Sequence, residues 1–102
     1  MAISDVQAKG SMYHVYDQSN KEISHEWVSS RGDLMGFTAS FMVFKKRDMY
    51  YICDEKFKEI SHDWVSSLGD FRSAAGNSIT FVKSKMLYTR DSKLKEISHR
   101  WE

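Results

Sequence analysis

The residues with the clearest chemical potential are three histidines that recur in one motif. The heptapeptides KEISHEW, KEISHDW and KEISHRW follow one another at intervals of 37 residues and start at Lys21, Lys58 and Lys95. Three imidazoles are the ligand set of an open zinc site, so a threefold axis that gathered His25, His62 and His99 would create one. The competing interpretation is that each histidine packs beside its tryptophan and hydrogen-bonds a backbone carbonyl. We favour the second, because equivalent residues off the symmetry axis stay apart.

Tyrosines offer a second kind of site. Tyr16, Tyr51 and Tyr88 fall on the less apolar face of their predicted strands, beside polar residues. An amphipathic ring with a polar tip suits contacts with a carbohydrate or with a protein. The sequence therefore predicts repeated shallow sites between sheets, lined by these tyrosines and open to one of those two ligands.

Motifs for catalysis are missing from the sequence. It contains no glycine-rich phosphate loop, no nucleophile elbow and no paired-cysteine motif. Near-identical copies also disfavour an enzyme, because catalysis needs unlike groups around one centre. We expect a binding or structural repeat module that is not an enzyme and has no cofactor. The alternatives are a metal-binding protein using the three histidines and a self-assembling scaffold.

The elements that position these residues are three copies of one unit within a single domain, residues 1–102. The copies span residues 1–38, 39–75 and 76–102. MYHVYD, MYYICD and MLYTRD are rich in aromatic and β-branched residues, and the KEISH segments alternate with period two, so both are predicted strands. An aspartate follows each first strand and is expected to bond its own turn backbone. Each unit is thus a predicted antiparallel meander of three or four strands.

Alternation along the KEISH strand predicts which face is buried. Position 26 is acidic, and its equivalents are acidic and basic in the next copies, a change that solvent tolerates best. The opposite face would then form the core, with the residues Ile23, His25, Trp27, Ile60, His62, Trp64, Ile97, His99 and Trp101. Tyr13 and Val15, with their equivalents, mark the more apolar face of the preceding strand.

Three meanders that share one core predict an all-β fold with pseudo-threefold symmetry, like a β-prism or trefoil, in which the tryptophans meet near the axis. The alternative is a three-bladed half of a six-bladed β-propeller closed by homodimerisation, because about four to eight blades are needed for a ring. The chain would be a monomer in the first case and a homodimer in the second.

The stretch MYHVYDQSNKEISHEW resembles the strand-turn-strand of the monocot mannose-binding lectin fold, a β-prism of three meander sheets with a central tryptophan in each. The resemblance implies the prism architecture. The family's sugar-binding signature of Gln, Asp, Asn and Tyr is absent, since the corresponding segment reads FVKSKMLYTRD, so mannose binding is not implied. SITFVKSKMLYTRDSKLKEISHRW is similar to a β-propeller blade.

Composition narrows the partners further. Fifteen Lys and Arg against fourteen Asp and Glu leave a formal charge of +1, too little for a nucleic-acid-binding protein. No apolar stretch approaches the roughly 20 residues of a membrane span, and the segment MAISDVQAKGS lacks the features of a signal peptide. A single cysteine cannot form an internal disulfide. We therefore expect no nucleic acid or membrane partner and a cytoplasmic location.

Overall fold

Three antiparallel sheets make up the computed structural model, which describes residues 2–101. Sheet 1 has the order β1-β2-β3, sheet 2 the order β4-β5-β6-β7, and sheet 3 the order β8-β9-β10-β11. The strands of sheet 1 are β1 (Asp5–Lys9), β2 (Met12–Tyr16) and β3 (Glu22–Trp27). Those of sheet 2 are β4 (Asp33–Phe37), β5 (Met42–Lys46), β6 (Met49–Cys53) and β7 (Glu59–Trp64). Those of sheet 3 are β8 (Asp70–Ala75), β9 (Ser78–Lys83), β10 (Met86–Asp91) and β11 (Glu96–Trp101). The all-β prediction is confirmed.

A single helical turn joins each sheet to the next. Helix α1 (Val28–Arg31) leads from β3 to β4, and α2 (Val65–Leu68) leads from β7 to β8. Gly32 and Gly69 end these turns with φ of 87° and 95°, a region that glycine enters without steric cost. The chain therefore passes from one sheet to the next at these two glycines. The predicted copy boundaries after residues 38 and 75 lie instead at hairpin turns inside sheets 2 and 3.

The turns β2–β3, β6–β7 and β10–β11 each contain an aspartate that bonds its own turn backbone, as predicted. The Oδ1 atom of Asp17 accepts hydrogen bonds from the backbone N–H groups of Ser19 at 2.8 Å and Lys21 at 3.0 Å. Asp54 and Asp91 make the same two bonds in their own turns. These carboxylates are thus occupied by their own backbone, as a short acidic side chain in a turn commonly is.

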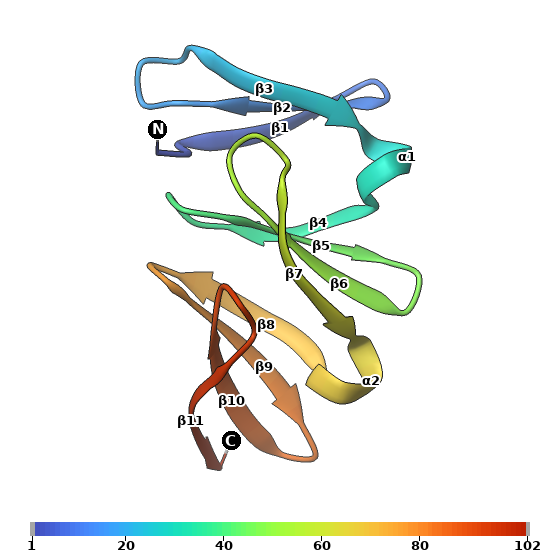
Figure 1. The fold of residues 1–102 in the computed structure, drawn as a ribbon, viewed down its shortest axis with the longest axis vertical. Helices are drawn as coiled ribbons and strands as arrows, with labels where there is room; N and C mark the ends of the chain where they lie inside the picture. Colours follow the sequence, from blue (N-terminus) through green and yellow to red (C-terminus); the bar gives the residue numbers. More distant parts are fainter. Residues whose placement is uncertain (1, 102) are drawn as a thin grey trace.

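The sheets stack in a row along the longest axis of the molecule, with sheet 1 and the N-terminus at one end and sheet 3 at the other (Figure 1). Sheet 2 is in the middle and is covered on both faces. The core between sheets 1 and 2 contains Ile3, Val6, Tyr13, Val15, Met42, Phe44, Cys53 and Phe57. The core between sheets 2 and 3 contains Phe41, Val43, Tyr50, Ile52, Leu68, Ile79, Phe81 and Leu94. This linear stack replaces the predicted closed threefold arrangement; closure by a second copy stays a prediction.

Equivalent contacts recur at the two interfaces between sheets. The ring of Tyr13 lies 5.3 Å from that of Phe44, and the ring of Tyr50 lies 5.1 Å from that of Phe81, between centroids. Such tilted aromatic pairs add to the free energy gained by burial. The predicted apolar face of the second strand, with Tyr13 and Val15, is therefore correct, and it packs on the sheet that follows.

The predicted Ile-His-Trp core is wrong. Trp27, Trp64 and Trp101 expose 54%, 55% and 76% of their surface. The histidines of the motif are exposed as well, as are Ile60 and Ile97, and Ile23 is half-buried against the core between sheets 1 and 2. The charge change at position 26 predicts that this position faces solvent and that the opposite Ile-His-Trp face is buried. In the structure, Glu26 instead lies at the edge of an interface, where it pairs with Arg31.

A β-bulge explains why simple alternation failed. In β3, Ser24 pairs with Val15 but Glu22 pairs with Tyr16, so Ile23 is an extra residue in the strand. The same shift occurs in β7 and β11. A bulge turns the residues beyond it to the opposite face. Ile23 therefore points to the core, whereas Glu22 joins His25 on the other face.

Candidate functional site

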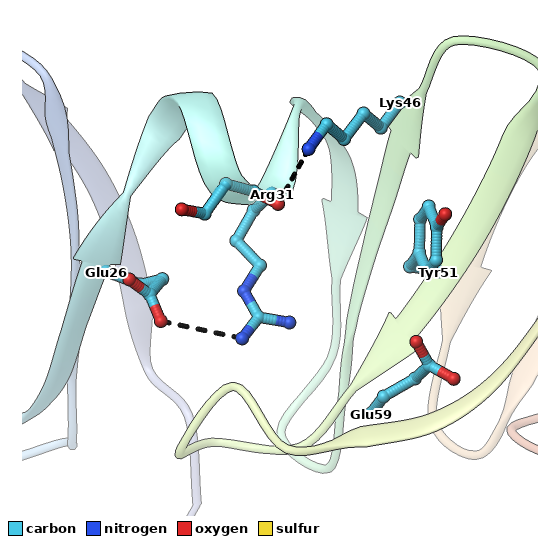
Figure 2. A pocket seen from close by; sticks show the side chains of 6 residues that line it. Glu26, Arg31, Lys46, Tyr51 and Glu59 are labelled. Carbon is cyan, nitrogen blue, oxygen red and sulfur yellow. Dashed lines mark hydrogen bonds and ion pairs between the residues drawn. The ribbon is translucent and has the colours of Figure 1, made fainter.

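A groove begins between sheets 1 and 2 (Figure 2) and continues over residues of sheet 2 alone. It consists of two adjoining hollows of about 350 Å³ and 370 Å³ that share Lys46 and Tyr51. The first hollow is lined by Glu26, Ser30, Arg31, Lys46, Tyr51 and Glu59. The second is lined by Lys46, Arg47, Asp48, Met49, Tyr51 and Trp64. We refer to these two hollows together as the groove.

Five elements position the side chains of the first hollow. Glu26 comes from the end of β3 and Arg31 from α1, so both belong to the sheet 1 side, and they lie across from Tyr51 of β6 in Figure 2. Lys46 ends β5 on one side of the hollow, and Glu59 starts β7 on the other. The bulge in β7 puts Glu59 on this face together with His62, because Glu59 pairs with Cys53 of the neighbouring strand.

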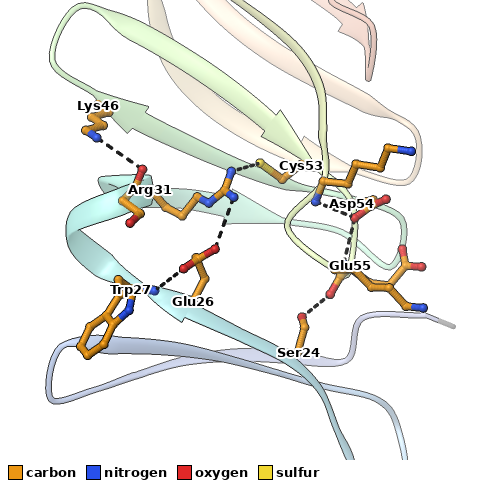
Figure 3. Close-up of polar contacts among 11 residues, drawn as sticks. Ser24, Glu26, Trp27, Arg31, Lys46, Cys53, Asp54 and Glu55 are labelled. Carbon is orange, nitrogen blue, oxygen red and sulfur yellow. Dashed lines mark hydrogen bonds and ion pairs between the residues drawn. The ribbon is translucent and has the colours of Figure 1, made fainter.

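The guanidinium of Arg31 is held by long contacts. One Nη lies 3.5 Å from a carboxylate oxygen of Glu26 and the other lies 3.7 Å from Sγ of Cys53 (Figure 3). Its carbon atom Cζ sits 5.8 Å from the centroid of the Phe57 ring. The buried Nε has no hydrogen-bond partner among the described residues. An Arg head with weak protein contacts keeps donor capacity for a ligand that enters the hollow.

Glu26 is ionised and oriented at the edge of the groove. Its Oε1 atom accepts a hydrogen bond of 3.0 Å from the backbone N–H of Trp27. This bond, with the additional effect of Arg31, holds the pKa of the Glu26 carboxyl below its usual value. On the opposite rim, Lys46 Nζ donates to the carbonyl of Ser30 at 3.4 Å. The first hollow thus presents two acids and two bases.

Aromatic groups continue the groove toward the outside. The Tyr51 ring lies 5.9 Å from the ring of His62, whose Nδ1 lies 2.7 Å from a carboxylate oxygen of Glu59. Trp64 and Met49 are directly paired across β6 and β7. Because Trp64 is more than half exposed, a flat apolar surface lies beside the charged hollow.

The interface between sheets 2 and 3 repeats most of these residue types. Lys83 Nζ donates to the carbonyl of Ser67 at 3.3 Å, and Asp63 accepts from the backbone N–H of Trp64 at 2.7 Å. Tyr88 lies 5.9 Å from His99, which lies 3.0 Å from Glu96. Each of these contacts matches one at the first interface.

An arginine is present at both interfaces but comes from opposite sides. At the first interface Arg31 of sheet 1 faces Cys53. At the second, Leu68 stands at the position of Arg31, and Arg90 stands at the position of Cys53. Arg90 donates to the carbonyl of Leu94 at 2.9 Å, and Leu94 is the equivalent of Phe57. The two substitutions compensate, since each interface keeps one guanidinium near the same turn.

The structure separates the three tyrosines that the sequence indicated. Tyr51 lines the groove, and Tyr88 has the same position in sheet 3. Tyr16 instead lines a different hollow of about 270 Å³ on the outer face of sheet 1, with Gln7, Lys9 and Asn20. Tyr16 corresponds to Cys53 in the repeat, and the equivalent of Tyr51 in sheet 1 is His14.

The motif histidines do not converge, because His25, His62 and His99 belong to three different sheets. Each has its Nδ1 atom beside a glutamate of its own strand, at 3.2, 2.7 and 3.0 Å. His14 shares Glu22 with His25, which lowers the pKa of the Glu22 carboxyl. Within residues 2–101 no three His, Cys, Asp or Glu side chains form a metal-binding group. The geometry therefore gives no support to the zinc alternative.

Sequence reasoning missed the two acids and the arginine of the first hollow. Alternation predicts Glu26 and Glu59 in solvent, since the bulge that reorients Glu59 is invisible in a period-two pattern. Leu68 stands at the position of Arg31 in the next copy, which predicts a solvent-exposed Arg31 without a role in a site. A signal was present: the exchange of Arg31 and Cys53 for Leu68 and Arg90 between copies indicates spatial contact, because compensating differences mark neighbouring residues.

Comparisons of the chain with protein-family models, with curated proteins and with solved structures found no match. The two helices among the described residues are single turns, and neither has the length or apolar character needed to cross a membrane. The case for function therefore rests on the groove itself.

Proposed function

We propose that the chain is a non-catalytic binding module that takes a neutral, polyhydroxylated ligand, such as a sugar unit, in the groove between adjacent sheets. The observation that carries this proposal is the combination of balanced charge and exposed aromatic surface. Glu26, Glu59, Arg31 and Lys46 surround one hollow, and Trp64 is open to solvent beside it.

Balanced charge argues for a neutral ligand. A polyanion such as nucleic acid gains affinity from many cations along its path, but here two acids line the same hollow as the two cations, and one of them, Glu26, lies 3.5 Å from Arg31. Hydroxyl groups act both as donors and as acceptors, so they can accept from Arg31 and Lys46 while donating to Glu26 and Glu59. The proposal thus satisfies every charged group of the hollow without adding a net charge.

Aromatic surface argues for a ligand with apolar faces. Tyr51 and Trp64 present ring surface next to polar groups that would orient the ligand, the usual combination in small-molecule sites. The recurrence of Lys83, Tyr88 and Glu96 at the second interface supports a second, similar position. Stacked sheets lie about 10 Å apart, so a polymeric ligand could contact both interfaces.

A binding screen with matched tryptophan variants tests the proposal. The chain would be applied to an array of neutral and charged glycans, with an array of extended peptides in parallel. Trp64→Ala is expected to weaken binding of a retained glycan by about tenfold, the effect of about 1.4 kcal/mol. Trp27→Ala is the matched control, because Trp27 is equally exposed but belongs to sheet 1, whose outer face is covered by no other sheet among residues 2–101.

Three results would contradict the proposal. One is that no neutral glycan is retained at millimolar concentration. Another is that Trp64→Ala and Trp27→Ala have the same effect on binding. The third is that peptides, in place of glycans, bind at Tyr51. The groove would then still be a binding site, but for a different class of ligand.

A further inference from the structure

Sheet 1 is one strand narrower than the other two sheets. Sheets 2 and 3 have four strands each, whereas sheet 1 has three among residues 2–101. In the repeat, β1 corresponds to β5 and β9, so the strand that sheet 1 lacks is the counterpart of β4 and β8. The outer edge of β1 is therefore an edge that a strand covers in both other sheets, but not in sheet 1 within the described part of the chain.

Backbone groups of β1 point to this open edge. The N–H of Val6 donates to the carboxylate of Asp5 at 2.9 Å, so it faces away from β2. Because the direction of the backbone groups alternates along an antiparallel strand, the N–H and the carbonyl of Ala8 face the same way. The equivalent residues of sheets 2 and 3 all pair with the fourth strand: Val43 with Gly36, Lys45 with Asp33, Thr80 with Ser73 and Val82 with Asp70.

The fourth strands of sheets 2 and 3 show which kind of segment such an edge accepts. Both β4 and β8 begin with an aspartate that follows a glycine, Gly32 or Gly69. A Cβ on these glycines would strike the carbonyls of Lys45 and Val82, which are the counterparts of Ala8. A segment on the edge of β1 therefore needs a glycine before its aspartate, because a larger residue would collide with the Ala8 carbonyl.

A second glycine is needed where the fourth strand is covered by the next sheet. In β4, a Cβ on Gly36 would come within 2.9 Å of the Phe71 ring of β8. Leu34 is the counterpart of Phe71 and is half-buried at the core between sheets 1 and 2. A strand added to sheet 1 would place its own residue of this kind over Leu34. The preceding residue, Met35 in β4, packs against the core of the next interface, so an apolar residue is favoured there.

We propose that the outer edge of β1 binds an extended peptide segment of a partner protein with the pattern Gly-Asp-x-apolar-Gly, which becomes the fourth strand of sheet 1. Backbone hydrogen bonds to Val6 and Ala8 supply the affinity, and the close approaches at the two glycines supply the specificity. In a second copy of this chain β4 and β8 are already paired in their own sheets, so the segment belongs to a different protein.

The Asp5 side chain guards this edge when no segment is bound. Its carboxylate occupies the N–H of Val6, and the side-chain amide of Gln7 holds that carboxylate at 2.9 Å. A charged side chain on an edge strand opposes indiscriminate pairing with other strands. The incoming segment displaces this one exposed contact. None of these residues lines the groove, so the proposal is independent of the proposed function.

Titration with a synthetic peptide tests the proposal. The probe has the sequence of residues 30–39, SRGDLMGFTA. At peptide concentrations up to about 1 mM, which cover weak binding, it should shift the amide NMR signals of Val6 and Ala8 and slow their hydrogen exchange. Ala8→Pro removes an N–H that faces the open edge and should weaken binding at least about tenfold. Ala8→Val keeps this N–H and is the matched control. Because Ala8 is exposed on an edge strand, both variants are expected to keep the circular dichroism spectrum of the original chain.

Changes in the peptide give a test that does not depend on the stability of a protein variant. Gly36→Leu in the peptide should weaken binding at least about tenfold, because the added side chain would meet Leu34 of the protein. Phe37→Tyr in the peptide is the control and should change binding by less than about twofold. Phe37 of β4 faces the preceding sheet, so the same position of a peptide on sheet 1 faces solvent.

Four results would overturn the proposal. One is that the signals of Val6 and Ala8 do not change over the whole titration. Another is that only Val43 and Lys45 respond, which would mean that the peptide displaces β4 from sheet 2. The third is that Ala8→Pro and Ala8→Val weaken binding equally. The fourth is that Trp64→Ala abolishes peptide binding, which would place the peptide in the groove.

Discussion

Removal of one buried hydroxyl tests whether the sheets are joined as the structure shows. The Tyr50 hydroxyl donates to the carbonyl of Gly69 at 2.9 Å and accepts from the backbone N–H of Phe71 at 2.9 Å. It therefore connects sheet 2 to the first residues of sheet 3. Tyr50 is 1% exposed, and burial raises the pKa of its hydroxyl, which stays protonated and able to donate.

Tyr50→Phe keeps the ring and deletes both hydrogen bonds. A buried backbone group left without a partner costs about 1–3 kcal/mol. Two backbone groups lose their partner here, the carbonyl of Gly69 and the N–H of Phe71. Water reaches these groups, next to the end of α2, more easily than it reaches the buried ring. We therefore expect the free energy of unfolding to fall by about 2 kcal/mol. For a chain of this size, a loss of that magnitude lowers Tm by roughly 10 °C.

The assay is urea unfolding followed by tryptophan fluorescence, together with a thermal scan. Tyr51→Phe is the matched control: Tyr51 is the next residue on the same strand, its ring faces the groove, and among the described residues its hydroxyl makes no hydrogen bond. A Tyr50→Phe variant within about 0.5 kcal/mol of the Tyr51→Phe variant would refute the reasoning, since that is the range of neutral surface changes.

Three further changes probe other parts of the stack. Gly69→Ala is expected to destabilise by more than about 3 kcal/mol in urea unfolding, because the added Cβ would strike the carbonyl of Val82 at a φ of +95°. Ser61→Ala should cost about 1 kcal/mol in the same assay, through the lost bond to Ser92. Burial raises the pKa of Cys53 to about 11 from an ordinary value of 9.0; native protein should therefore resist iodoacetamide at pH 8, and its stability should fall as the pH rises from about 9 toward 11.

Local patterns predicted the strands and turns well because short-range chemistry determines them. Aromatic and β-branched runs such as MYHVYD became strands, and Asp17 closes its turn with its own carboxylate. Tyr13 and Val15 point to the core as alternation requires. These features depend on residues close in sequence, so the chain reveals them without knowledge of the fold.

The arrangement of the sheets depends on interactions that a repeat pattern does not contain. Three equal units are compatible with a ring around an axis and with a row. The difference lies in which residues meet across sheets: Phe44 packs on Tyr13, and Phe81 packs on Tyr50. Phe44 and Phe81 each belong to the copy that follows the copy of their partner, so each copy packs on the next. The tryptophans, which a closed core would have buried, stay exposed on the edge strands β3, β7 and β11.

The bulge that breaks the alternation of faces in the KEISH strand also creates the candidate site. With regular alternation, Glu59 would point with Ser61 into the interface between sheets 2 and 3, where a carboxylate without a partner is costly. The extra residue sends Ile60 to that side and brings Glu59 next to His62, on the face that opens toward sheet 1. One irregularity thus turns an isoleucine toward one side of sheet 2 and brings an acid to the groove on the other. Because it recurs in every copy, each meander can pack on the sheet that follows while it contributes to a groove facing the sheet that precedes.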